Sequence, residues 1–164
     1  MTHGEFAVYC IDTSSLVDLW RWRPMKRHKE VWERVEQLIE DSRLVAPKMV
    51  LDELHRQDDE PATWARGRKR GLFRRTSQDL VKLARKICNE FHGLVDPDQP
   101  FNSADPFVVA LAVLESKAVY GQKVFVVTEE RYAPDSPRIP RVCEAYGLKY
   151  LTIHQMFLFE GWNF

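Results

Sequence analysis

The sequence predicts a single α/β domain, spanning residues 1–164, in which helices cover both faces of a mostly parallel central sheet. Short apolar runs alternate with helical patterns along the chain. The runs are apolar at nearly every position, which is typical of strands that are buried on both faces. A length of 164 residues fits one domain with its own core. We therefore expect a three-layer α/β/α fold.

The first half of the chain opens with an apolar run over 6–11, which predicts a buried strand. A short helix should follow, with Thr13 or Ser14 as its N-cap, and Pro24 should end it. "RLVAP" predicts a second strand, and the helix after it breaks up in the acidic "DDEP". Between these, helical spacing predicts a helix over about 28–41 with a buried stripe at Val31, Trp32, Val35, Leu38 and Ile39.

The second half contains an arginine-rich segment, 61–75, and then a long helix over about 77–92. The turn-rich "GLVDPDQPFNSADP" leads into a strongly apolar helix, "DPFVVALAVLESKAV". "KVFVVTEER" and "KYLTIH" predict two further strands, separated by the short helix "PRVCEAYG" and followed by a helix from about Gln155. The buried stripe of the long helix is expected at Leu80, Leu83, Ala84, Ile87, Cys88 and Phe91.

Composition indicates the class of protein and the cellular compartment in which it is expected. Apolar residues make up 45% and charged residues 29%, a soluble globular profile, and the formal net charge is zero. Three scattered cysteines, Cys10, Cys88 and Cys143, argue against a disulfide framework or a zinc site and favour a reducing compartment. No signal peptide and no apolar run of membrane-spanning length stand out. We expect a cytoplasmic protein that does not enter a membrane.

Carboxylates are predicted to gather at one edge of the sheet. In doubly wound sheets, ligands bind outside the carboxyl ends of the strands. Asp12 ends the first strand, and Glu129 and Glu130 end "KVFVV". Asp105 opens the apolar helix that precedes that strand, and Glu53 lies on the helix after "LVAP". We therefore expect four carboxylates at this edge: Asp12, Glu53, Asp105 and either Glu129 or Glu130.

Helical spacing selects Glu53 over its neighbour Asp52. At about 100° per residue, one apolar stripe runs along this helix. Asp52 points nearly opposite the stripe, toward solvent, whereas Glu53 lies on its flank and can reach the sheet edge. The stripe consists of Pro47, Val50, Leu51 and Leu54.

Converging carboxylates repel one another unless a cation neutralises them. Oxygen ligands without histidine or cysteine suit Mg²⁺ or Mn²⁺, which can hold a phosphodiester oxygen and lower the pKa of a bound water. Taken singly, Asp12 and Asp105 are also good helix N-caps, Glu53 a solvated helix residue, and Glu129 or Glu130 a charged loop residue. Their predicted convergence favours a metal site.

Four motifs together resemble a known family. "YCIDTSSLVDLW", "VLDELHR", "SADPFVVALA" and "VVTEER" are similar, in order and over nearly the whole chain, to the acidic motifs of PIN-domain ribonucleases. The resemblance implies that Asp12, Glu53 and Asp105 are catalytic metal ligands and that Glu130 takes the fourth position. That position usually holds aspartate, so the choice between one and two metal ions stays open. The implied supporting residues are Thr13, Ser14, Ser103 and Thr128.

The implied function is a metal-dependent endoribonuclease that uses Mg²⁺ or Mn²⁺ and acts as the toxin of a toxin–antitoxin pair. "IPRVCEAYGLKYLTIHQMF" also resembles the tail of a PIN-like branch suspected of containing toxins. The implied partners are RNA, an antitoxin protein and a second copy of the chain. The alternative is a non-catalytic PIN-like module that binds RNA or protein through a degraded site. A haloacid-type phosphatase is disfavoured because Ser14 stands where its Asp-x-Asp motif needs the second aspartate.

The arginine-rich segment "RGRKRGLFRR" is the predicted RNA-binding element. A cationic patch beside an acidic site could hold phosphates, and Trp64 and Phe73 could stack on unpaired bases. The competing interpretation is a solvated surface whose aromatic side chains pack inward. The cationic side chains proposed to contact RNA are Arg66, Arg68, Lys69, Arg70, Arg74 and Arg75.

Overall fold

The computed structural model describes residues 7–56, 59–94, 103–135 and 137–164. Within these ranges five strands form one sheet in the order β3-β2-β1-β4-β5, and every neighbouring pair is parallel. This confirms the α/β fold class, with a sheet that is parallel throughout. The strands are β1 (Val8–Ile11), β2 (Leu44–Pro47), β3 (Phe73–Arg74), β4 (Val124–Val127) and β5 (Lys149–Leu151).

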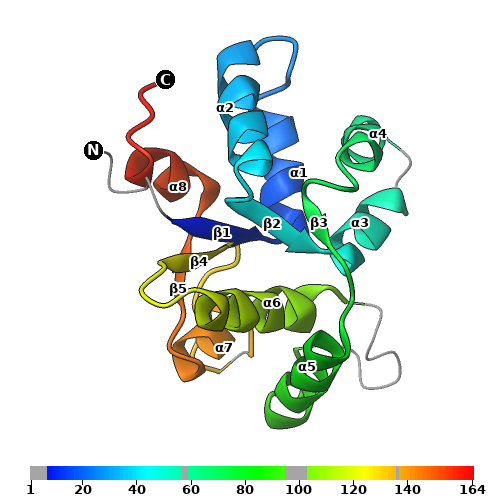
Figure 1. The fold of residues 1–164 in the computed structure, drawn as a ribbon, viewed down its shortest axis with the longest axis vertical. Helices are drawn as coiled ribbons and strands as arrows, with labels where there is room; N and C mark the ends of the chain where they lie inside the picture. The colour runs from blue at the N-terminus through cyan, green and yellow to red at the C-terminus, as the bar shows by residue number, and fades with distance from the viewer. Residues whose placement is uncertain (1–6, 57–58, 95–102, 136) are drawn as a thin grey trace.

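Helices flank the sheet on both faces, as a three-layer fold requires. Figure 1 shows α1, α2 and α8 on one side of the sheet and α5, α6 and α7 on the other. Among the described residues, no helix is long and apolar enough to cross a membrane. The helices are α1 (Thr13–Trp22), α2 (Lys29–Glu40), α3 (Lys48–His55), α4 (Glu60–Gly67), α5 (Gln78–Glu90), α6 (Asp105–Ala118), α7 (Ile139–Ala145) and α8 (Ile153–Phe159).

The central strand β1 is the point from which the sheet grows in both directions. Cys10 pairs with Val45 of β2 on one side and with Val126 of β4 on the other. Every residue of these three strands is buried, which explains their unbroken apolar sequences. Because strand order reverses at β1, the carboxyl ends of β1 and β4 border a switch point, where ligands bind in open parallel sheets.

Some sequence expectations were wrong. The N-cap of α1 is Asp12, whose carboxylate accepts the Ser15 backbone N–H; neither Thr13 nor Ser14 caps the helix. The arginine-rich segment contains helix α4 and the short edge strand β3, which the sequence pattern did not reveal. Part of the expected first strand, including Phe6, lies outside the described residues.

The predicted helices are otherwise confirmed with small shifts of their ends. In α2, all five expected stripe residues are buried. In α5, capped by Ser77, the fully buried positions are Leu80, Ala84 and Ile87, while the other expected stripe positions are half-buried. Thr152 ends the region predicted as strand and caps α8 through a capping box with Gln155.

Candidate functional site

Asp12 is the buried centre of the acidic edge, the group formed by Asp12, Glu53, Asp105 and Glu130. Its side chain is only 2% exposed. The Ser14 hydroxyl donates to both carboxylate oxygens, at 2.8 and 2.9 Å, and the Ser15 backbone N–H donates at 2.8 Å. Burial raises the pKa of Asp12 to about 6, although hydrogen bonds from Thr128, Ser15 and Ser14 lower it. Asp12 is therefore both a helix cap and a buried charge without a cation.

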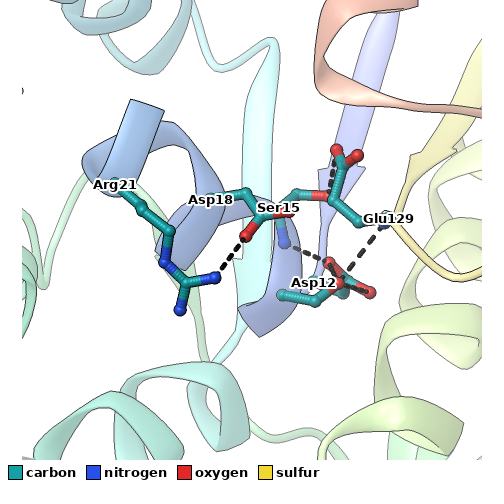
Figure 2. Close-up of polar contacts among 6 residues, drawn as sticks. Asp12, Ser15, Asp18, Arg21 and Glu129 are labelled. Atoms are coloured by element: carbon teal, nitrogen blue, oxygen red, sulfur yellow. Dashed lines mark hydrogen bonds and ion pairs between the residues drawn. The ribbon is translucent and has the colours of Figure 1, made fainter. Parts of the chain in front are cut away.

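Hydroxyl groups connect the ends of β1 and β4 around this carboxylate. The Thr128 hydroxyl donates to Asp12 Oδ2 at 2.5 Å and accepts the backbone N–H of Glu130 at 3.1 Å. The Ser14 hydroxyl accepts the backbone N–H of Glu129 at 3.3 Å. The predicted supporting residues Ser14 and Thr128 thus fix both Asp12 and the loop that carries the two glutamates. Figure 2 shows Asp12, Ser15 and Glu129 gathered at the start of α1.

Asp105 lies at the first position of α6, and its pKa is raised further than that of Asp12. The N-cap of α6 is Ala104 and makes no side-chain cap bond, so the N-cap interpretation of Asp105 is wrong. Burial raises the pKa of Asp105 to about 8, with further contributions from the charges of Glu130, Asp12 and Glu53. Glu130, Asp12 and Glu53 therefore all lie within electrostatic reach of Asp105.

Glu53 reaches the same edge from α3. It is half-buried, whereas Asp52 is exposed, which confirms the choice made from helical spacing. A Glu53 carboxylate oxygen accepts the backbone N–H of Ala104 at 2.5 Å. Ser103 contributes on the same loop, where its hydroxyl accepts the backbone N–H of Asp105 at 3.3 Å. Glu53 and Ser103 thus hold the start of α6, and with it Asp105, in place.

The two glutamates after β4 face different surroundings. Glu129 accepts the backbone N–H of Ile153 at 2.8 Å and lies 3.4 Å from the Ser15 hydroxyl. Glu130 accepts the backbone N–H of Ile139 at 3.0 Å, and its charge raises the pKa of Asp105. The electrostatics favour Glu130 over Glu129 as the fourth member of the acidic edge.

The donor chemistry of this edge fits a hard divalent cation, because every candidate ligand is a carboxylate oxygen. Among the described residues, however, no group of three histidine, cysteine or acidic side chains already forms a set that could hold a metal ion. Glu53 and Glu130 are instead hydrogen-bonded to backbone amides. Each of these bonds uses one carboxylate oxygen, Oε1 of Glu53 and Oε2 of Glu130, so the second oxygen of each is the atom that could join Asp12 and Asp105 around an ion.

Two further residues, Cys143 and Thr13, lie near this edge, and only Thr13 carried a signal of a role in the sequence. Cys143, on α7, is fully buried, and burial together with the charges of Asp12 and Glu130 raises the pKa of its thiol well above the usual range. The Thr13 hydroxyl is buried and has no hydrogen-bond partner in the described part of the chain. The place of Thr13 beside Asp12 predicts its supporting role, whereas the sequence shows Cys143 only as one of three cysteines without a paired spacing.

The arginine-rich segment lies away from the acidic edge, contrary to the expectation that the two would be adjacent. Residues 66–71 precede β3 and line a cavity with Ser42, which precedes β2. In a parallel sheet, residues that precede strands lie opposite the carboxyl ends. Only Arg75 follows β3 toward the acidic edge. Position therefore separates the cationic turn from the carboxylates.

Several members of this segment have structural partners. Arg68 donates from Nε to Glu36 at 2.6 Å, and Arg74 lies 3.6 Å from Glu115. Trp64 and Phe73 are 8% and 7% exposed, so their rings pack inward and the base-stacking expectation is wrong. Lys69, Arg70 and Arg75 are exposed and accessible to phosphates, and Arg66 is exposed as well.

One comparison with known proteins matches this chain. A family described as "Domain of unknown function (DUF4411)" matches residues 9–164. The match includes Asp12, Glu53, Asp105 and Glu130, so the acidic edge lies within the family region. A comparison with curated proteins gives no match. The description of the family assigns no activity.

Proposed function

The chain belongs to the DUF4411 family, and we propose that it is a PIN-like, metal-dependent endoribonuclease that hydrolyses RNA phosphodiester bonds. One observation carries the proposal: Asp105 is half-buried at the carboxyl end of a parallel sheet, where desolvation and the charges of Glu130, Asp12 and Glu53 together raise its pKa to about 8. Such unbalanced negative charge favours binding of a divalent cation. The order of the four motifs, which resembles PIN-domain ribonucleases, supports the same conclusion.

Asp12, Glu53, Asp105 and Glu130 would hold Mg²⁺ or Mn²⁺. When bound, the ion would supply charge stabilisation at a phosphodiester oxygen and a water of lowered pKa. The chain itself orients the ligands. Ser14 and Thr128 hold the Asp12 carboxylate by hydroxyl hydrogen bonds, so that it need not reorganise when the ion arrives.

RNA would also be held by the cationic side chains. Arg75 follows β3 toward the acidic edge, while Lys69 and Arg70 precede it at the opposite edge. An RNA strand that contacts all three would cross the β3 side of the sheet. Arg68 is bound to Glu36, so its part is to shape the turn rather than to contact phosphate. The proposed role in a toxin–antitoxin pair, the antitoxin partner, the homodimer and the cytoplasmic location rest on the sequence alone.

A non-catalytic RNA- or protein-binding module is the second candidate. The observation that favours it is that Glu53 and Glu130 already bind backbone amides at the starts of α6 and α7. In that case both glutamates would be helix-end caps and no divalent ion would bind. The two candidates therefore differ in whether metal changes the protein at all.

The decisive experiment incubates the purified chain with end-labelled RNAs under three conditions: Mg²⁺, Mn²⁺ and excess chelator. We expect discrete cleavage products with either metal and none with chelator. RNA binding without cleavage under all three conditions would favour the non-catalytic module, and cleavage that persists in chelator would contradict the metal-dependent proposal.

A further inference from the structure

A cavity of about 1010 Å³ lies on another part of the molecule, between the end of α1, the face of α2 and the start of α4. None of the residues of the acidic edge lines it. Its volume is at the upper end of small-ligand sites in proteins. Nothing in the proposed nuclease function uses this cavity, so what it could bind is a separate question.

Three tryptophans form one wall of the cavity. The ring centroids of Trp20 and Trp32 are 4.9 Å apart, and those of Trp32 and Trp64 are 5.2 Å apart. Trp32 donates its indole N–H to the Arg23 carbonyl at 2.7 Å, and Trp64 donates to Glu36 at 3.0 Å. Trp20 is only half-buried, and its indole nitrogen has no hydrogen-bond partner among the described residues. Trp20 therefore offers the ring face that a ligand could cover.

Carboxylates outnumber cations around this aromatic wall. Two lysines, Lys26 and Lys29, line the side formed by the α1–α2 connection. Along α2, the acidic residues fall on one face at intervals of three and four residues, which correspond to rises of about 4.5 and 6 Å. The five acidic residues that line the cavity are Glu33, Glu36, Glu40, Asp59 and Glu60.

One cation of the protein, Arg68, already contacts both a tryptophan ring and a carboxylate at the edge of this cavity. The guanidinium carbon of Arg68 lies 5.6 Å from the Trp64 ring centroid. The same guanidinium donates to both carboxylate oxygens of Glu36, at 2.6 and 2.5 Å. Aromatic face and carboxylate thus bind a cation together at the edge of the cavity. Trp20, Glu33 and Glu40 line the same cavity, and neither of these two carboxylates has an ion-pair partner in the described part of the chain.

We propose that this cavity binds an extended aliphatic polycation of the polyamine class. The methylene segments would lie against Trp20, which alone of the three tryptophans is not buried, and the ammonium groups would meet the carboxylates of α2 and of the start of α4. Glu36 is already bound by Arg68, so the ammonium groups would pair with Glu33 and Glu40. These two lie seven residues, or about 10.5 Å, apart along α2, close to the distance between the terminal ammonium groups of an extended triamine. The apolar wall disfavours a strongly hydrated metal ion, and the carboxylates exclude a phosphate ligand. The ammonium groups would lie away from Lys26 and Lys29.

The test is calorimetric titration of the folded chain with spermidine at low salt. The double variant Glu33→Gln/Glu40→Gln changes only exposed side chains, so the fold should persist, and we expect spermidine to bind at least about tenfold more weakly. Trp20→Phe should weaken binding less. Glu30→Gln is the matched control: Glu30 is an exposed carboxylate of α2 that does not line the cavity, and its loss should leave the affinity nearly unchanged.

Two further arms locate the ligand. In Asp105→Asn, spermidine binding should be retained, because the acidic edge is a different site; loss of binding there with retention in the double variant would overturn the proposal. Binding of an uncharged diol of equal length as tightly as spermidine would also overturn it. So would binding of a lysine-rich peptide by a chain that does not bind spermidine, because the cavity would then be a protein-docking groove. These outcomes are independent of RNA cleavage.

Discussion

Two regions of this molecule bury carboxylates, and they balance the charge in opposite ways. Glu160, at the end of α8, is 6% exposed and accepts hydrogen bonds from the Tyr9 hydroxyl and from the Arg43 guanidinium, the latter at 2.6 Å. For Asp105, at the start of α6, the described residues provide no such cation, and burial and the neighbouring charges all raise its pKa. The first carboxylate is neutralised by the chain; the second is not.

This difference separates a carboxylate that holds the fold from one that is available to a ligand. Glu160 joins α8 to β1 through Tyr9 and to the α2–β2 connection through Arg43, so its charge is already neutralised within the protein. Asp105 is surrounded by Glu130, Asp12 and Glu53, which repel it. A buried charge that the protein leaves unbalanced is a candidate functional group.

The largest expected effect is the loss of RNA cleavage in Asp105→Asn. Asparagine keeps the shape but removes the anionic charge that a hard cation prefers, so we expect cleavage to fall on the order of 10²-fold to 10³-fold. The measurement is the single-turnover cleavage rate with Mg²⁺ or Mn²⁺. Thermal stability of the metal-free variant should equal or exceed that of wild type, because a repelled charge is gone. Full activity in Asp105→Asn would contradict the metal site.

At Glu160, whose charge is balanced by Arg43, we expect a loss of stability rather than a loss of RNA cleavage. Glu160→Gln leaves the Arg43 guanidinium in a largely buried position without its anionic partner, and we expect the free energy of unfolding to fall by about 3 kcal/mol. Urea denaturation measures it. RNA cleavage, assayed well below the midpoint, should stay close to wild type. A destabilisation below about 0.5 kcal/mol would show that this ion pair is not what holds α8.

The main features of the fold were predictable from the sequence because strand-length apolar runs and helical stripes are local signals. β4 and α2 illustrate this: their buried residues coincide with unbroken or periodic apolar positions. β3 could not be found, because a two-residue edge strand has no pattern and exists only through its pairing with β2. The order of the strands likewise depends on contacts between distant segments.

The acidic edge was predictable for a similar reason and the cationic segment was not. Strand ends in a parallel sheet share one edge, so Asp12 and Glu130 could be placed together from sequence position alone. The cationic segment required knowledge of which side of β3 each arginine occupies. The pairing of Arg68 with Glu36, which lies 32 positions away, has no sequence signature.

Metal binding should distinguish the acidic edge from the ion pair of Glu160 in the wild-type protein. A cation that binds the acidic edge of the native state adds about 2.7 kcal/mol at one hundred times its dissociation constant, and Tm should rise by several degrees with millimolar Mn²⁺ or Mg²⁺. In Asp105→Asn the shift should shrink strongly, whereas in Glu160→Gln the same shift should occur from a lower starting Tm. An equal shift in wild type and Asp105→Asn would place the cation elsewhere.

The pH dependence of stability provides a smaller effect. The pKa of Asp105 is about 8 and that of Asp12 about 6 in the native state, both above the ordinary value of 3.8. Between these limits the native state holds more protons than the unfolded chain, so its stability falls as pH rises. For metal-free protein we expect a progressive loss of stability from pH 5 to pH 8. Urea denaturation in chelator measures it, and Asp105→Asn should remove most of the slope; an unchanged slope would contradict this account.

The smallest effect is expected at the cationic turn, which the fold separates from the acidic edge. Lys69→Ala/Arg70→Ala should weaken RNA binding and reduce the slope of log affinity against log salt by about 1.4, because each contact with single-stranded phosphate contributes about 0.7. Lys82→Ala, an exposed cation on α5, serves as the control. Neither variant should alter the single-turnover cleavage rate at saturating protein, whereas Asp105→Asn should alter that rate and leave the salt slope unchanged. An unchanged slope in the double variant would mean that RNA does not reach the far edge of the sheet, and that Arg75 marks the limit of its path.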